Sequence, residues 1–566
     1  MIEGNVVDVR SGRVIQARVS HEAGVIRSVE KVSHDFDGYL IPGLIDSHIH
    51  IESTLLCPSR FAEVAVPHGT TAVVGAPHEI ANVLGLPGME YVIKDSATVP
   101  LRFYFTAPSC VPATLFETSG AAFGPGEIEQ LLVRDEFVAL GEMMDYPGAI
   151  ARDPAVMAKI DVARRLHKPI DGHAPLLSGP GLEEYVSLGI STDHECTSFE
   201  EACQKASLGM VIMVRQGSAS RDLEHLAPFA REHEFILVSD DMSASDLIQG
   251  YLDRSLAEAT ALGIDPVHAL RAATINPALH YGLPLGAIEV GRKADIVKVR
   301  DLRSFEVEEV YIGGELVASG GVARFDVRPK EMANRFFPQR KMPSDFEVTT
   351  ALPNVDVRVI GLIEDEIVTE SLVAGLRSES GKVMPDIESD ILRISVVNRY
   401  QDAPVSNGFV KGFGLKSGAF ASTVAHDSHN IIVVGVGSDS MATAVNALIQ
   451  EGGGFCVCSD GRCTMLNLRI AGLMCTKPAH EVKRVLDSLV ERVRALGCTV
   501  RNPFMTLSFL SLLVIPKLKL GDKGLFDGES FRFVDVIKTP SESGAPENVA
   551  GRNPDPTRVS KPSVQG

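Results

Sequence analysis

Residues 42–56, PGLIDSHIHIESTLL, contain two histidines one residue apart at the end of a short apolar run. Side chains alternate between the two faces of a β-strand, so His48 and His50 point the same way. Two imidazoles on one face of a strand end can hold one metal ion. This stretch alone leaves open a second interpretation, a pair of surface histidines on an edge strand.

Strand-like apolar runs alternate with helical stretches from about residue 41 onward. The runs are 40–50, 70–79, 101–109, 136–144, 169–174, 189–195, 209–217 and 235–241. Eight strand–helix units in about 240 residues are typical of a (β/α)8 barrel. A doubly wound sheet is the main alternative, but its Gly-rich phosphate turn is missing after the first run. We therefore predict an α/β fold built on a (β/α)8 TIM-type barrel.

The segments on either side of the predicted barrel, 41–284, have a different pattern. Residues 1–40 and 285–327 consist of short strand-like runs with Gly turns, and we expect them to form one small β-domain. Residues 346–540 predict an additional C-terminal α+β domain. The remaining residues, 541–566, are rich in Pro, Gly and Ser and predict a disordered tail.

Charge and hydropathy exclude several classes of partner. The net charge of −19 argues against binding to nucleic acid or to an anionic membrane, since both require a basic surface. No segment approaches the roughly 18 uninterrupted apolar residues of a membrane span. The first residues lack the apolar core of a signal peptide, so we expect a cytoplasmic protein.

The nine cysteines are scattered, with an odd count and no framework spacing, which predicts reduced thiols. Their only cluster is CVCSDGRC, which contains Cys456, Cys458 and Cys463. Cys456 and Cys458 alternate along a strand-like run that ends in a Ser-Asp-Gly turn. We therefore favour packing within a sheet over a zinc site.

Polar residues gather where the predicted barrel strands end, which is where active sites of such barrels are built. They are His48, His50, His78, Glu79, Glu142, His173, His194, Glu195, Asp240 and Asp241. Buried imidazoles and carboxylates are costly unless they are paired or bound to metal. We therefore predict that His48 and His50 are metal ligands.

The ligand types indicate the chemistry. Imidazoles with carboxylates suit divalent ions such as zinc, manganese, iron or cobalt. Even four histidines exceed the needs of one open catalytic site, so we predict two ions bridged by Glu142. A water between two ions loses a proton near neutral pH, and Asp240 would carry that proton to the leaving group. Glu79 is the next candidate for moving the proton. The predicted reaction is metal-assisted hydrolysis of a carbon–nitrogen bond.

Three segments resemble the amidohydrolase superfamily: PGLIDSHIHIES, LRAATINPALHYGL and GAIEVGRKADIV. Nearly the whole chain resembles one branch, the adenine deaminase family. The segments that carry this resemblance include VPHGTTAVVGAPHEIANVLG, GEMMDYPG, DGHAPLLSG, STDHECTSFEEA and GFVKGFGLKSGAFASTVAHDSHNIIVVG.

The resemblance implies hydrolysis of adenine to hypoxanthine and ammonia. It implies two divalent metal ions, with manganese first and iron or zinc as alternatives, and a small-molecule purine as substrate. Carried over by motif, the metal ligands would be His48, His50, Glu142, His173, His194 and Asp240. We also expect a homo-oligomer.

The chain departs from the usual residues of this family at Ala76, at Met242 and Ser243, and at Arg399 and Tyr400. Because polar groups at the barrel rim orient the purine, we expect slower turnover of adenine than in members with the usual residues. Two alternatives stay open: another amino-heterocycle or cyclic amide as substrate, or a paralogue that binds a purine without turnover.

The loop AHDSHN contains His426, Asp427 and His429. It could close over the substrate or hold another ion. We favour a hydrogen-bonded structural loop.

Overall fold

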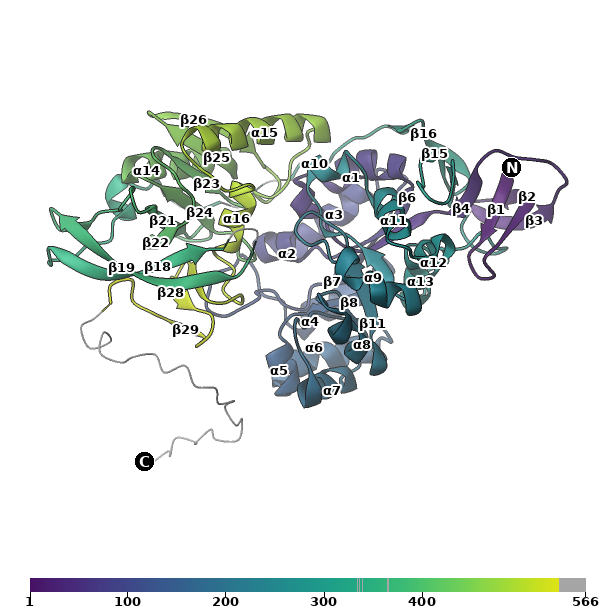
Figure 1. Ribbon diagram of the computed structural model, residues 1–566, viewed down its shortest axis with the longest axis horizontal. Helices are drawn as coiled ribbons and strands as arrows, with labels where there is room; N and C mark the ends of the chain where they lie inside the picture. The colour runs from purple at the N-terminus through teal and green to yellow at the C-terminus, as the bar shows by residue number, and fades with distance from the viewer. Residues whose placement is uncertain (333, 335, 338, 364–365, 539–566) are drawn as a thin grey trace.

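The computed structural model describes residues 1–332, 334, 336–337, 339–363 and 366–538. The predicted disordered tail, 541–566, lies outside the described residues. Three units follow one another across the molecule: a small sheet that begins at the N-terminus, a barrel, and a C-terminal unit (Figure 1). None of the described helices has the length and apolar character needed to cross a bilayer.

The predicted (β/α)8 barrel is confirmed. Its strands are β5 (Leu44–His50), β6 (Thr70–Gly75), β7 (Arg102–Ala107), β8 (Phe137–Met143), β9 (Ile170–Gly172), β10 (Thr192–Asp193), β11 (Val211–Arg215), β12 (Ile236–Val238) and β13 (Asp240–Asp241). All pairings between these strands are parallel. A bridge between Ile170 and Ile190 joins β9 to the β10 side, and β13, which follows β12 after Ser239, pairs with β5. These two contacts close the ring.

The barrel strands are buried on both faces because helices cover their outer side. Every residue of β5, β6 and β8 is buried, and β8 is accordingly free of polar side chains up to Glu142. The helices are α1 (Pro58–Ala65), α2 (His78–Leu84), α3 (Leu86–Ser96), α4 (Pro125–Leu132), α5 (Tyr146–Ile150), α6 (Pro154–Arg165), α7 (Gly179–Ser187), α8 (Phe199–Ser207), α9 (Leu223–Glu232), α10 (Ala244–Leu247), α11 (Leu252–Ala261), α12 (Pro266–Ala272) and α13 (Ile275–His280).

One eight-stranded sheet combines residues from both flanks of the barrel. Its order is β17 (Val322–Ala323), β16 (Glu315–Ser319), β15 (Val307–Ile312), β14 (Ile296–Val299), β4 (Tyr39–Pro42), β1 (Ile2–Asp8), β2 (Arg13–Glu22) and β3 (Val25–Lys31). Strand β4 joins the two halves, because it pairs in parallel with β1 and antiparallel with β14. Gly43 then connects β4 to β5 at a point where a Cβ would lie only 2.0 Å from Thr71 Oγ1.

The C-terminal unit is built on a nine-stranded mixed sheet. Its order is β20 (Lys382–Val383), β19 (Thr369–Glu379), β18 (Asn354–Leu362), β22 (Ser406–Lys411), β21 (Ile391–Val397), β24 (Ile431–Gly435), β23 (Ala419–Ser422), β25 (Gly454–Ser459) and β26 (Arg462–Asn467). Helix α14 (Ser438–Glu451) covers one face, while α15 (Ala479–Ala495) and α16 (Pro503–Phe509) cover the other. A hairpin of β27 (Leu518–Gly521) and β28 (Gly524–Asp527), extended by β29 (Arg532–Phe533), follows α16.

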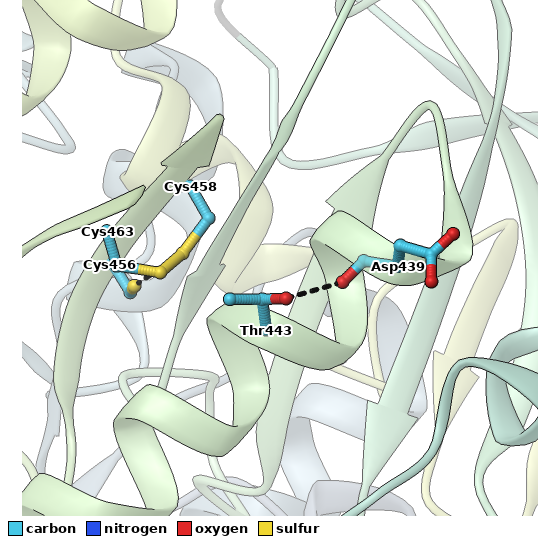
Figure 2. Close-up of a disulfide and its surroundings, with 5 residues drawn as sticks. All are labelled: Asp439, Thr443, Cys456, Cys458 and Cys463. Carbon is cyan, nitrogen blue, oxygen red and sulfur yellow. Dashed lines mark hydrogen bonds between the residues drawn. A yellow bond between two sulfur atoms is a disulfide. The ribbon is translucent and has the colours of Figure 1, made fainter. Parts of the chain in front are cut away.

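The prediction that all cysteines are reduced thiols is wrong for one pair. Cys458 and Cys463 form a disulfide between β25 and β26 (Figure 2). The two residues stand directly opposite each other in the hairpin, with their Cα atoms 4.2 Å apart. Such closeness is a property of the cross-strand register, which the spacing of cysteines along the chain does not show.

The C-terminal unit packs against the rim of the barrel. Leu56 pairs with Cys475 in a short parallel bridge, and Arg60 Nε donates to the Thr476 carbonyl. On the other side of the contact, the backbone N–H of Thr118, in the loop between β7 and α4, donates to Asp522 Oδ1 at 2.9 Å. These contacts bring the loop 425–430 to the polar ends of the barrel strands.

Candidate active site

The six residues predicted as metal ligands lie together at the carboxyl ends of the barrel strands. His48 and His50 are on β5 and Glu142 is on β8. His173 follows β9, His194 follows β10, and Asp240 begins β13. The side chains come together because parallel strands of a closed barrel all end at the same rim.

Glu142 lies at the middle of this cluster, with each carboxylate oxygen facing different imidazoles. Oε1 is 3.5 Å from His50 Nε2 and 3.3 Å from His78 Nδ1. Oε2 is 3.0 Å from His173 Nδ1 and 3.4 Å from His194 Nε2. A carboxylate whose two oxygens serve two separate groups of nitrogen atoms has the arrangement of a bridging ligand.

Asp240 faces the β5 histidines from the other side. Its Oδ1 is 3.2 Å from His48 Nε2 and 3.0 Å from His50 Nε2. Its Oδ2 lies 3.4 Å from Arg215 Nη1. One oxygen of Asp240 therefore points into the cluster, while the other is held by a guanidinium.

The donor atoms fit a divalent metal ion. His48 Nε2 and Glu142 Oε1 are buried without a hydrogen-bond partner among the described residues, although buried polar atoms are normally satisfied. Three groups of side chains have ligand atoms within 4.8 Å of one another: His48, His50 and Glu142; His48, His194 and Asp240; and Glu142, His173 and His194. His50 Nδ1 donates to the Ala76 carbonyl at 3.0 Å, which orients its Nε2 toward the cluster, as in known metal sites.

The electrostatics of the cluster favour ionised carboxylates. Burial would raise the pKa of Glu142, but the neighbouring imidazoles of His173, His194 and His78 hold that pKa well below its usual range. Burial likewise opposes ionisation of Asp240, and the imidazoles of His48 and His50 outweigh it and lower the pKa. Both carboxylates are therefore anionic at neutral pH, the form in which carboxylates bind metal ions.

Glu79 joins the barrel to the C-terminal unit. It lies in the first turn of α2, buried, with its Oε1 3.4 Å from His78 Nε2. His426 Nδ1 donates to Glu79 Oε1 at 2.6 Å, and His429 Nε2 contacts Glu79 Oε2. The loop of His426 and His429 is hydrogen-bonded, as predicted, and its partner is Glu79 at the barrel rim.

Arg399 and Tyr400 support this loop from behind. The Arg399 side chain is fully buried, and its Nη1 donates to the His429 carbonyl at 3.3 Å. The Tyr400 hydroxyl donates to the Ser428 carbonyl. At these two positions, which are expected to depart from the family pattern, the side chains therefore contact the loop 425–430.

The residues at the other two expected departures have local structural roles. Ser243 caps the N-terminus of α10, since its hydroxyl accepts from the Asp246 N–H at 3.1 Å. Met242 is buried, with the Ser218 hydroxyl directed at its sulfur. Ala76 presents its carbonyl to His50 and has no polar side chain to offer a substrate.

Two residues close to the cluster were absent from the predicted ligand set. His78 Nδ1 is buried without a hydrogen-bond partner among the described residues and points at Glu142, although the sequence placed it at a strand end. Arg215, the last residue of β11, donates to Glu195 Oε1 at 2.5 Å and to Asp222 Oδ2 at 2.8 Å. A charged residue that ends an otherwise apolar barrel strand is a signal that could have identified Arg215.

The chain is similar to known proteins over nearly its whole length. The model of the amidohydrolase family matches residues 39–317, and that of the adenine deaminase C-terminal domain matches residues 366–532. The adenine deaminase of Methanothermobacter thermautotrophicus is 49% identical over 543 residues, which cover 95% of this chain and 100% of that protein. The adenine deaminase of Methanosphaera stadtmanae is 45% identical over 541 residues, covering 95% and 99%.

Among solved structures, an adenosine deaminase from Xanthomonas campestris with bound zinc has a TM-score of 0.44 and 18% identity, over 57% of this chain and 94% of that one. This likeness is too low to support an argument about function. The family of this chain is shown by the two near-full-length relatives and by the matches to both family models. The chain belongs to the adenine deaminase family of amidohydrolases.

Proposed function

We propose that this protein hydrolyses adenine to hypoxanthine and ammonia at the cluster around Glu142. The observation that carries the proposal is the convergence of four imidazoles and two carboxylates at one barrel rim, with buried ligand atoms that make no hydrogen bond within the described chain. The near-full-length relatives named adenine deaminase support adenine as the substrate.

The cluster would hold two divalent ions, and we propose manganese, with iron or zinc as alternatives. His48, His50 and Glu142 would hold one ion, while Glu142, His173 and His194 would hold the other. Asp240 would complete the set beside His48 and His50. When bound, such ions lower the pKa of a water from about 15.7 toward about 7 and so supply a nucleophile at neutral pH.

Asp240 would move a proton during the reaction. Addition of water to C6 of adenine releases one proton from the nucleophile, and the departing N6 amine must gain one to leave as ammonia. The Asp240 carboxylate lies beside the β5 histidines and is anionic, so it can accept the first proton and deliver it to N6.

Glu79 would act at the purine ring. When water adds to C6, the C6–N1 double bond becomes single and N1 must gain a proton. The second proton of the water supplies it, because the C6 hydroxyl loses this proton as the carbonyl of hypoxanthine forms. Burial would raise the pKa of Glu79, but the imidazoles of His426 and His429 hold that pKa well below its usual range, so the Glu79 carboxylate is anionic and can take this proton and pass it to N1. Glu79 lies next to His78 and is held in place by His426 and His429 of the C-terminal unit. We assign Glu79 to N1, which makes the C-terminal unit part of the active site.

The test is formation of hypoxanthine and ammonia from adenine by the purified full-length protein after loading with manganese. We expect turnover that disappears on chelation and returns on adding manganese. A matched panel of adenosine, 2,6-diaminopurine and a cyclic amide checks the substrate class. Release of ammonia from another member of the panel, but none from adenine, would refute the assignment. The homo-oligomeric state and the cytoplasmic location stay predictions.

A further inference from the structure

Three cysteines converge in the C-terminal unit on the side of the sheet away from the candidate active site. Cys456 and Cys458 of β25 belong to the core cluster that contains α14 residues such as Met441 and Leu448. The active-site loop is on the other side, where His426 stacks on Phe509 of α16. The cysteine cluster is therefore separate from the proposed deaminase chemistry.

The positions of the sulfur atoms follow from strand geometry. Cys456 and Cys458 are two residues apart and so share a face, and Cys463 of β26 stands directly opposite Cys458. Cys456 Sγ lies 3.5 Å from Cys458 Sγ, beside the disulfide (Figure 2). Ligand atoms of all three residues lie within 4.8 Å of one another.

This spacing suits a metal thiolate. Zinc–sulfur bonds of about 2.3 Å at tetrahedral angles separate two sulfur ligands by about 3.8 Å. The 3.5 Å between Cys456 and Cys458 is close to that separation. All three sulfur atoms already lie within 4.8 Å of one another, so opening the disulfide leaves Cys463 close enough to share an ion with the other two.

We propose that, with the Cys458–Cys463 disulfide reduced, Cys456, Cys458 and Cys463 form a binding site for a thiophilic metal ion. A dithiol reductant supplies the two electrons: it cleaves the S–S bond, becomes a disulfide itself, and leaves two protein thiols. The ion then binds three thiolates and displaces three protons to solvent.

The surroundings define the class of ion. The group contains sulfur ligands only, and thiolates select soft or borderline ions such as Cu(I), zinc or cadmium. Thr443 of α14 lies nearby, but its hydroxyl donates to the Asp439 carbonyl (Figure 2). Cys463 is partly exposed, so the ion can enter from that side and keep one solvent ligand.

Burial explains why the site depends on a metal. It raises the pKa of Cys456 to about 12, so this thiol stays protonated unless a cation displaces the proton. In the oxidised chain two of the three sulfurs are bonded to each other and cannot both serve as thiolate ligands. The disulfide and the metal site are therefore mutually exclusive states of the same three residues.

The experiment is a titration of the full-length protein with cadmium alone, read by the ultraviolet charge-transfer band of cadmium thiolates. This band is blind to the imidazole and carboxylate site in the barrel. We expect the reduced protein to develop the band up to one equivalent, and the oxidised protein to develop none. Cys456→Ser should bind cadmium more than about tenfold more weakly, because one of three thiolate donors is lost.

Two further variants keep the test decisive. Cys203→Ser removes a half-buried cysteine elsewhere in the chain and should titrate like the wild type. Cys463→Ser, at the most exposed of the three positions, repeats the test if Cys456→Ser fails to fold. A reduced wild type that shows no more band than the triple variant Cys456→Ser, Cys458→Ser and Cys463→Ser would overturn the proposal.

Discussion

The link between Glu79 and the C-terminal unit is tested most sharply by His426→Phe. His426 donates from Nδ1 to Glu79 Oε1 at 2.6 Å, and its ring stacks on Phe509 with centroids 5.0 Å apart and planes 11° from parallel. Phenylalanine keeps the ring and the stacking but removes the donor. The substitution therefore isolates the hydrogen bond from the packing.

The expected loss follows from the charge on Glu79. A hydrogen bond to a charged group is worth about 1.5–3 kcal/mol, which corresponds to a factor of roughly 10 to 150 in rate. His429 still contacts the other oxygen of Glu79, so we expect the lower end, about a tenfold decrease in kcat/KM for adenine. Metal content should not change, because His426 contacts none of the six proposed ligands in the described structure.

The assay is hypoxanthine formation under initial-rate conditions, with metal content measured on the same preparation. His426→Asn should recover much of the lost rate, since its amide can donate from nearly the same position as Nδ1. His480→Phe, at an exposed histidine of α15, is the matched control and should leave the rate unchanged. Normal kcat/KM in His426→Phe, or a loss of metal ions that accounts for the defect, would refute the role of this contact.

Other predictions address metal binding, proton transfer and pH. Glu142→Gln should bind about one ion instead of two, because a neutral amide bridges two cations poorly; elemental analysis showing two retained ions would contradict the bridge. Asp240→Asn should keep most of its metal but lose about 10²–10⁴-fold in turnover, the usual contribution of a general base; near-normal turnover would assign the proton to another group. Burial lowers the pKa of Lys519 to about 7, and its Nζ donates to the Ile367 and Phe509 carbonyls. Between pH of about 7 and about 10.4 the Lys519 amine is therefore protonated in the unfolded chain and neutral in the folded protein. The free energy of unfolding rises with pH in this window, and this stability is lost as pH falls through it. The urea midpoint of the wild type should increase across this window relative to that of Lys519→Met, and parallel midpoints would exclude this contribution.

Much of the barrel and its rim could be predicted from the sequence, because both depend on local rules. Most of the strands appear as apolar runs of strand length, and a polar residue that ends such a strand necessarily reaches the shared rim of a closed parallel barrel. His48, Glu142 and Asp240 were identified in this way, although they are far apart in the chain. That these residues lie at one rim can be predicted without knowing how the side chains pack.

The contacts that complete the site could not be derived from these rules. Glu79 and His426 are 347 residues apart, and only the docking of the C-terminal unit on the barrel brings them together. The disulfide between Cys458 and Cys463 likewise depends on the register of one hairpin, which places the two residues opposite each other. Periodicity determines which face of an element is buried, whereas the partner across an interface is selected by packing between distant segments, which no local pattern encodes.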